Sequence, residues 1–128
     1  MYLTASSVLF WLVLLIALGI IFIGARFIVA PQAGAKGFGV PAADAEKVAY
    51  LWAKGTRDVV SGLLLIVLLW LKVNPIVIGA FMLTAALIPM GDLINVYVHA
   101  GKGKGPALMI HGGTALFMWV LAFLLLLR

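Results

Sequence analysis

Residues 54–71 read KGTRDVVSGLLLIVLLWL, so a lysine, an arginine and an aspartate stand directly before a long apolar run. Comparable apolar runs cover about residues 8–29, 75–98 and 107–127. A transmembrane helix needs about 20 mainly apolar residues, and none of these runs alternates with period two as a barrel strand would. The sequence therefore predicts an all-α integral membrane four-helix bundle, with residues 1–128 forming a single transmembrane domain.

The composition supports a membrane class and excludes several others. The chain is 66% hydrophobic and 10% charged, with a mean hydropathy of +1.24, whereas soluble domains have about 25% charged residues. The absence of cysteine excludes disulfides and thiol chemistry. Two histidines are too few for a histidine-rich metal site, and no basic cluster is interleaved with aromatic residues. We therefore expect no metal, no cofactor and no nucleic-acid partner.

The charges outside the apolar runs predict the orientation of the chain. Four spans place both termini on one side, and seven of the nine lysines and arginines then fall on the other side. Because positively charged residues remain in the cytoplasm, we expect a multi-pass protein of the cell (inner) membrane with both termini extracytoplasmic. The segment at about residues 31–47, rich in Gly, Pro and Ala, is expected to be a cytoplasmic loop. Asp44 is predicted to cap the helix that leads into the second span.

One polar layer connects the four predicted spans. At about 1.5 Å rise per residue, each span brings an ionisable residue to a similar depth on the loop-rich side: Arg26, Arg57 with Asp58, Asp92, and His111. A lone charge in lipid costs about 2.5–3.5 kcal/mol on insertion scales. These side chains are therefore expected to face the interior of the bundle and to pair there.

The polar layer predicts a site with acid–base chemistry. Lys54, Asp58 and Ser61 share one helix face, and Asp92 and Asn95 share another. An arginine between the two aspartates would keep one carboxylate ionised to activate water, while the other carboxyl group would donate a proton. Opening an epoxide needs such a base and acid. The predicted catalytic residues are Asp58, Asp92, Arg57 and His111, and the predicted substrate-binding residues are Arg26, Lys54, Ser61 and Asn95.

These residues also allow plainer interpretations. Arg26 could extend its charged end to the membrane surface, and Lys54 could contact lipid headgroups. Asp58 beside Arg57 could neutralise charge at a helix start. A negative charge at Asp92, late in its helix, opposes the helix dipole and is harder to explain without a function. The glycines next to the polar residues could serve close helix packing or leave room for a ligand.

Four stretches together resemble a family of small four-helix membrane proteins catalogued as a domain of unknown function (DUF family 4267). They are GARFIVAPQAGAKGFGVP (24–41), YLWAKGTRDVVSGLLL (50–65), ALIPMGDLINVYVH (86–99) and IHGGTALFM (110–118). The resemblance implies the same fold and points to the polar positions named above. It implies no established activity.

Three functions fit the sequence. We favour a membrane-embedded enzyme, of the epoxide hydrolase, cyclase or isomerase type, that acts on a lipophilic small molecule. A small transporter or binding protein for an ion or organic molecule would use the same charged residues. A purely structural role would make the polar layer a lock between helices, which leaves no cavity. The bilayer and a lipophilic small molecule are the expected partners, and a homo-oligomer is left open.

Overall fold

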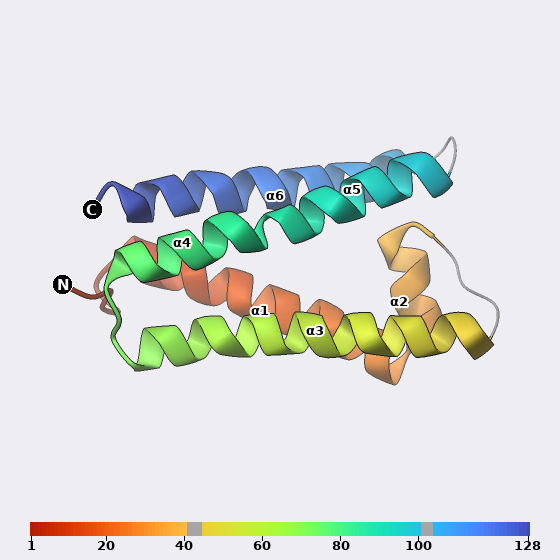
Figure 1. Ribbon diagram of the computed structural model, residues 1–128, viewed down its shortest axis with the longest axis horizontal. Coiled ribbons are helices and arrows are strands. Elements are labelled where there is room, and N and C mark those ends of the chain that lie inside the picture. The colour runs from red at the N-terminus through yellow and green to blue at the C-terminus, as the bar shows by residue number, and fades with distance from the viewer. Residues whose placement is uncertain (41–44, 101–103) are drawn as a thin grey trace.

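The computed structural model describes residues 1–40, 45–100 and 104–128, and within these ranges the ordered elements are all helices (Figure 1). Asp44, the predicted helix cap, lies outside the described residues. The helices are α1 (Val8–Val29), α2 (Pro31–Phe38), α3 (Ala45–Trp70), α4 (Pro75–Ala85), α5 (Leu87–His99) and α6 (Gly105–Leu126). The all-α prediction is confirmed.

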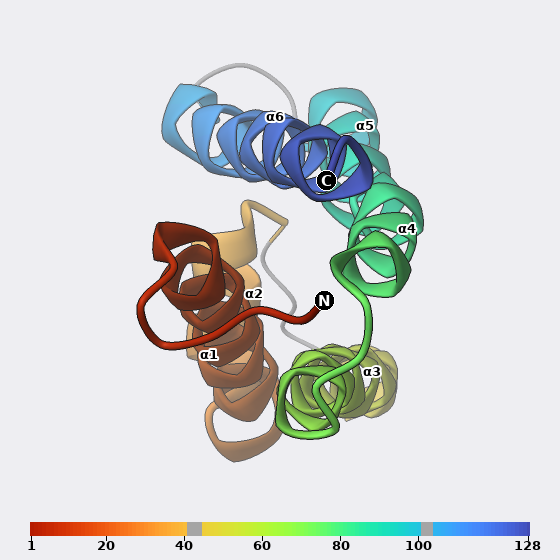
Figure 2. The same ribbon diagram turned by 90° about the vertical axis from the view of Figure 1, so that its left-hand side faces the viewer.

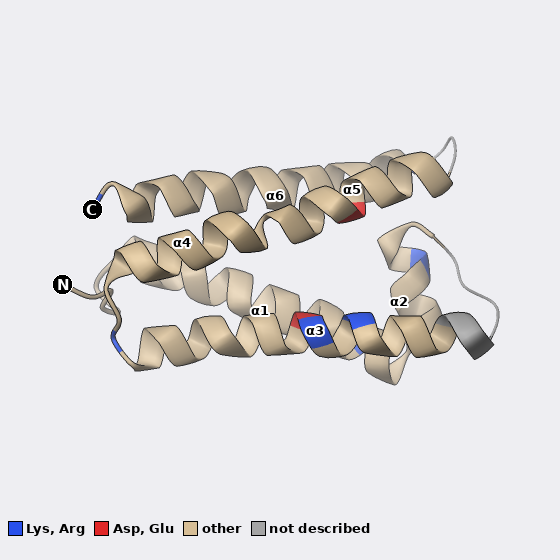
Figure 3. Cartoon of the chain, viewed as in Figure 1, with Lys and Arg blue, Asp and Glu red and all other residues tan. Residues whose placement is uncertain are grey.

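Three helical stretches among the described residues are long and apolar enough to cross a membrane. They are Val8–Val29, Pro75–His99 and Gly105–Leu126, the second of which joins α4 and α5. Helix α3 has 26 residues and contains the span expected at 54–71, but three charged residues lie near its middle (Figure 3). The chain therefore has the character of a multi-pass membrane protein.

The helices form two groups (Figures 1 and 2). Helices α1 and α3 run side by side, and α6 runs beside α4 and α5. Both termini lie at one end of the molecule, while α2 lies between the two groups at the opposite end. Apolar side chains pack in the half near the termini, where Val13, Leu65, Met82 and Leu125 are fully buried. The half near α2 is left for the polar residues.

Small residues allow α1 and α3 to approach closely. A Cβ atom added at Gly24 would lie 2.6 Å from the Gly55 carbonyl oxygen, and one at Gly62 would lie 2.6 Å from the Ala17 carbonyl oxygen. Real Cβ atoms do not come this close to other atoms. In both cases the contacted atom belongs to the backbone, which cannot rotate away as a side chain can. The sequence left open whether these glycines serve packing or a ligand, and at Gly55 and Gly62 the answer is packing.

The segment predicted as a loop over about residues 31–47 is helical over residues 31–38. Pro31 occupies the first position of α2, where its missing N–H costs no hydrogen bond. Gly39 ends the helix with φ of 108°, a left-handed conformation that favours glycine. Helix α3 then starts at Ala45 and continues without a break into the predicted second span. The loop prediction was wrong for residues 31–38. A high content of Gly and Pro indicated a loop, but Pro31 and Gly39 stand at the two ends of a short helix, where these residue types are favourable.

The predicted span at 75–98 consists of two helices. Asn74 caps α4, since its side-chain Oδ1 accepts a hydrogen bond from the Ile76 N–H, and Pro75 takes the first helical position, where its missing N–H costs no hydrogen bond. The helix is interrupted at Ala86. Pro89 has no N–H to donate to the Ala85 carbonyl four residues earlier, which weakens the helix at this point.

We expect valine at Gly24 or Gly55 to destabilise the fold. The added side chain must push α1 and α3 apart, at a cost of about 1–3 kcal/mol. The midpoint of thermal unfolding in detergent measures the effect. Gly91→Ala and Gly113→Ala are matched controls, because a Cβ atom at either position has nothing within 4 Å. Equal stability of Gly24→Val and the wild type would contradict the close α1–α3 packing.

Candidate functional site

A cavity of about 240 Å³ lies between the two helix groups next to α2. All six helices contribute to its wall. Most of the wall is apolar, including Phe27 from α1, Phe38 from α2 and Phe81 from α4. The polar side chains that line it are Arg26, Lys54, Asp58, Ser61, Asp92, His111 and Thr114. The predicted polar layer is therefore gathered around one cavity.

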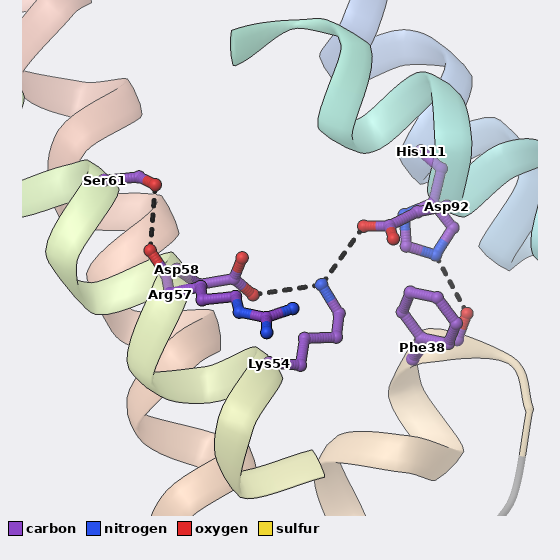
Figure 4. Close-up of polar contacts among 7 residues, drawn as sticks. All are labelled: Phe38, Lys54, Arg57, Asp58, Ser61, Asp92 and His111. Atoms are coloured by element: carbon purple, nitrogen blue, oxygen red, sulfur yellow. Dashed lines mark hydrogen bonds and ion pairs between the residues drawn. The ribbon is translucent and has the colours of Figure 1, made fainter. Parts of the chain in front are cut away.

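Lys54 lies at the centre of the polar part of the wall (Figure 4). Its Nζ atom is 3.1 Å from Asp58 Oδ2 and 3.3 Å from Asp92 Oδ2, close enough to donate a hydrogen bond to each. Asp58 is one turn further along α3, whereas Asp92 comes from α5. The side chain of Asp92 is 21% exposed and that of Asp58 only 10%. One ammonium group thus joins the two helix groups through two carboxylates.

Two aromatic rings enclose the same ammonium group. Lys54 Nζ lies 5.3 Å from the centroid of the Phe27 ring and 5.2 Å from that of Phe38. The faces of aromatic rings attract cations at this distance. Lys54 is therefore surrounded by two carboxylates and two rings, with the rest of the cavity wall mainly apolar.

The backbone explains how these side chains come together. Lys54 and Asp58 are four residues apart, so they lie on the same face of α3. Gly24 lets α3 pass close to α1 at this level, because a Cβ atom there would lie 2.9 Å from Asp58 Cβ. Asp92 lies in the turn of α5 that follows Pro89. The helix interruption at Ala86 therefore lies less than two helical turns before the second carboxylate.

His111 fastens the end of α2 to α6. Its Nε2 atom lies 2.9 Å from the Phe38 carbonyl oxygen. Since a carbonyl oxygen only accepts hydrogen bonds, Nε2 carries the hydrogen. The Phe38 ring also packs edge-on against the imidazole, with 4.8 Å between centroids. Gly39 then fits tightly against Ala107 and Val96, where a Cβ atom would lie 2.8 Å from Ala107 Cβ.

Two predicted site residues do not line the cavity, and both are exposed. Asn95 lies one turn beyond Asp92. Arg57 was expected between the two aspartates, but Lys54 occupies that position instead. The residues at 54, 58 and 61 share a face of α3, and position 57 is rotated about 100° from Asp58. The Arg57 carbonyl oxygen accepts a hydrogen bond from Ser61 Oγ at 2.8 Å.

The other six predicted residues contribute to the cavity wall. Arg26 is exposed at its edge, where Nη2 lies 3.4 Å from the Ala33 carbonyl oxygen of α2. Sequence reasoning missed Phe27 and Phe38. Phe27 follows Ile20 by seven residues and so shares its helix face, a signal that was present in the sequence. Phe38 had no such signal, because its position depends on how α2 docks. Among the described residues, no cluster of three or more histidine, aspartate or glutamate side chains could hold a metal ion.

Comparison with known families and proteins gives one match. A family model with the description "Domain of unknown function (DUF4267)" matches residues 17–125, which include every residue of the cavity wall. No curated protein and no solved structure matches the chain.

We expect His111→Leu to loosen α2. The variant loses the hydrogen bond to the Phe38 carbonyl, worth about 1 kcal/mol, which corresponds to about fivefold faster local opening. Hydrogen–deuterium exchange of the amides in residues 31–39 measures this opening. Thr114→Val is the matched control, because the Thr114 hydroxyl also lies at the cavity but bonds to Ile110 in its own helix. Unchanged exchange in His111→Leu would show that His111 does not hold α2.

Proposed function

The chain belongs to the family described as Domain of unknown function (DUF4267), and from its cavity we propose a function. We infer that it is a four-span membrane protein that binds a neutral lipophilic small molecule and acts on it by acid–base chemistry. The observation that carries the proposal is the position of Lys54, held between two carboxylates in an otherwise mainly apolar cavity.

Helix α3 is proposed as the fourth span. Its outer surface exposes Leu63, Leu64, Val67 and Trp70, and soluble proteins rarely expose such continuous apolar surface. Lipid contact would remove these side chains from water. The charged residues Lys54 and Asp58 turn toward the cavity instead, where intramembrane charges normally lie.

The charges at the cavity support a neutral ligand. Arg26 and Lys54 carry two positive charges, and Asp58 and Asp92 carry two negative charges, so the wall has no net charge when His111 is neutral. A charged ligand would lose its hydration without gaining an unpaired partner. A neutral molecule with one polar group meets donors and acceptors at Lys54 and Asp92, and apolar surface elsewhere.

The volume of the cavity limits the size of this ligand. An apolar cavity of about 150 Å³ holds benzene in another protein. In proportion, a cavity of 240 Å³ admits a molecule of about ten non-hydrogen atoms. The proposed ligand is therefore a compact lipophilic molecule, smaller than a membrane lipid.

The three charged groups can move a proton in a cycle. The Lys54 ammonium donates a proton to an oxygen of the ligand, and Asp92, the more exposed carboxylate, accepts one from water or from a hydroxyl group of the ligand. The proton on Asp92 then returns to Lys54 across their 3.3 Å contact. Asp58 keeps Lys54 in position. Epoxide opening, cyclisation and isomerisation all need such a paired donor and acceptor.

One observation favours transport as a second candidate. The interruption between α4 and α5 borders the cavity through Ala85, Ile88 and Pro89, and many transporters build their binding sites at broken helices. A transporter would release the ligand unchanged on the other side of the membrane. A purely structural lock is less well supported, because a lock between helices leaves no cavity.

We expect Asp92→Asn and Lys54→Met to abolish turnover in protein that still folds, with a lower unfolding temperature because each change removes one partner of an ion pair. Limonene 1,2-epoxide, a compact neutral epoxide, serves as the probe, with chromatography of the diol as the measurement. The loss should be about hundredfold or more, since general acid–base catalysis contributes about 10²–10⁴-fold. The matched control is Lys72→Met, because Lys72 lies just beyond the end of α3 and outside this cavity.

Three outcomes separate the candidates. Binding of the epoxide, seen as a rise in unfolding temperature, together with turnover lost in both variants supports the enzyme. Binding without turnover, with uptake into proteoliposomes, supports the transporter. An unchanged unfolding temperature for the wild type with the epoxide and with the related ketone and alkene would contradict the proposed ligand class.

We expect both termini to be extracytoplasmic. The natural chain contains no cysteine, so single-cysteine variants can report the orientation directly. Ser6→Cys lies at the N-terminal end, and Lys36→Cys lies on α2, and both positions are exposed. A membrane-impermeant maleimide should label the first in intact cells and the second only after permeabilisation. The reverse result would overturn the orientation inferred from the positive charges.

A further inference from the structure

We propose that Lys54 is a nucleophile that forms an imine with lipophilic aldehydes or ketones in the cavity. This inference rests on the proposed function, since it needs a neutral lipophilic ligand at this site, and it narrows the ligand to carbonyl compounds. Primary amines of lysine form imines with carbonyl carbons. Among the described residues that line the cavity, Lys54 is the only lysine.

The amine must first lose its proton, and a carboxylate is in place to accept it. Asp58 Oδ2 lies 3.1 Å and Asp92 Oδ2 lies 3.3 Å from Lys54 Nζ. Charges next to apolar surface are costly to maintain. Transfer of one proton from the ammonium to a carboxylate replaces two opposite charges by a neutral amine and a neutral acid, and leaves the lone pair of Nζ free to attack.

The following steps balance with the groups present. Nζ forms a bond to the carbonyl carbon as the C=O π bond breaks, and the carbonyl oxygen takes the proton that Nζ then releases, which gives a neutral carbinolamine. A carboxylic acid then donates a proton to the hydroxyl group, which leaves as water while the nitrogen lone pair forms the C=N bond. The products are one iminium group and one water molecule. No oxidant, reductant or further reactant is needed.

The surroundings of Lys54 fit the iminium product. Its single positive charge would replace that of the ammonium, so the charge balance with Asp58 and Asp92 is unchanged. The ring faces of Phe27 and Phe38, 5.3 and 5.2 Å from Nζ, would attract it as they attract the ammonium. A ligand that brought its own positive charge would disturb this balance, which is why a neutral carbonyl compound is preferred over an amine.

The test is reductive trapping of the purified protein in nanodiscs. The protein is incubated with 4-isopropylbenzaldehyde and sodium cyanoborohydride, which reduces iminium ions much faster than aldehydes, and peptide mass spectrometry locates the secondary amine. Because the cavity holds the aldehyde next to Nζ, we expect Lys54 to be modified about tenfold faster than Lys72, or more. Lys72 is the internal reference, since it is exposed and lies over the Tyr2 ring at the opposite end of α3.

Matched variants separate the role of Lys54 as a nucleophile from the role of its positive charge. Lys54→Arg keeps the positive charge but not the nucleophile, so it should fold and lose the trapped product at this position. Lys72→Arg should leave trapping at Lys54 unchanged. Asp92→Asn should slow trapping at Lys54 and not at Lys72, because it removes one of the two groups that accept and return the proton. Equal trapping at Lys54 and Lys72 in the wild type would overturn the proposal.

A ligand that cannot form an imine distinguishes the two proposals. 4-Isopropylbenzyl alcohol has the same size and apolar body as the aldehyde. If the alcohol raises the unfolding temperature of the protein but Lys54 is not trapped by the aldehyde, the imine is refuted and the proposed binding function stands. If the alcohol binds and protects Lys54 from trapping, both are supported. If the alcohol does not bind and Lys54 is not trapped, the binding proposal fails as well.

Discussion

The ion pairs of Lys54 connect the two helix groups across the cavity next to α2. Near the termini the two helix groups meet through fully buried apolar side chains. Near α2 they meet across a cavity, and Lys54 Nζ reaches Asp92 of the other group there. Removing one partner of such a pair leaves the other charge facing an apolar wall, which is far more costly than replacing both. The position of these three residues is therefore coupled to the arrangement of all the helices around them.

The close packing of α1 against α3 makes this arrangement possible. Gly24 and Gly55 bring the two backbones together at the level of the site, so Asp58 stands against α1 and toward the cavity. On the other side of the cavity, the interruption at Ala86 separates α4 from α5. Helix α2 then closes the end of the space, held by the contact of His111 with the Phe38 carbonyl. The first two of these features lie in backbone geometry, whereas the third depends on the side chain of His111.

The chemistry of the site follows from the contrast between its polar and apolar parts. An ammonium between two carboxylates is a common surface feature and is worth little in water. Here the same three groups border a cavity lined by Phe27, Phe38 and Ile20, where apolar side chains replace part of the solvent around their charges. The proposed acid–base catalysis and the proposed imine formation would both use this one property. Both need a ligand that fills the apolar part of the cavity and displaces water from it.

The sequence by itself determined the helical membrane character, the position of the long apolar runs and most of the polar layer, because hydropathy and helical spacing are local properties. Lys54, Asp58 and Ser61 could be placed on one face for this reason. Only the tertiary structure decided that Lys54, and not Arg57, stands between the aspartates, that residues 31–38 form a helix, and that Phe38 lies against His111. The pairs 54 with 92 and 38 with 111 are separated by 38 and 73 positions. Such contacts depend on how whole helices dock, and no periodicity within a single helix contains that information.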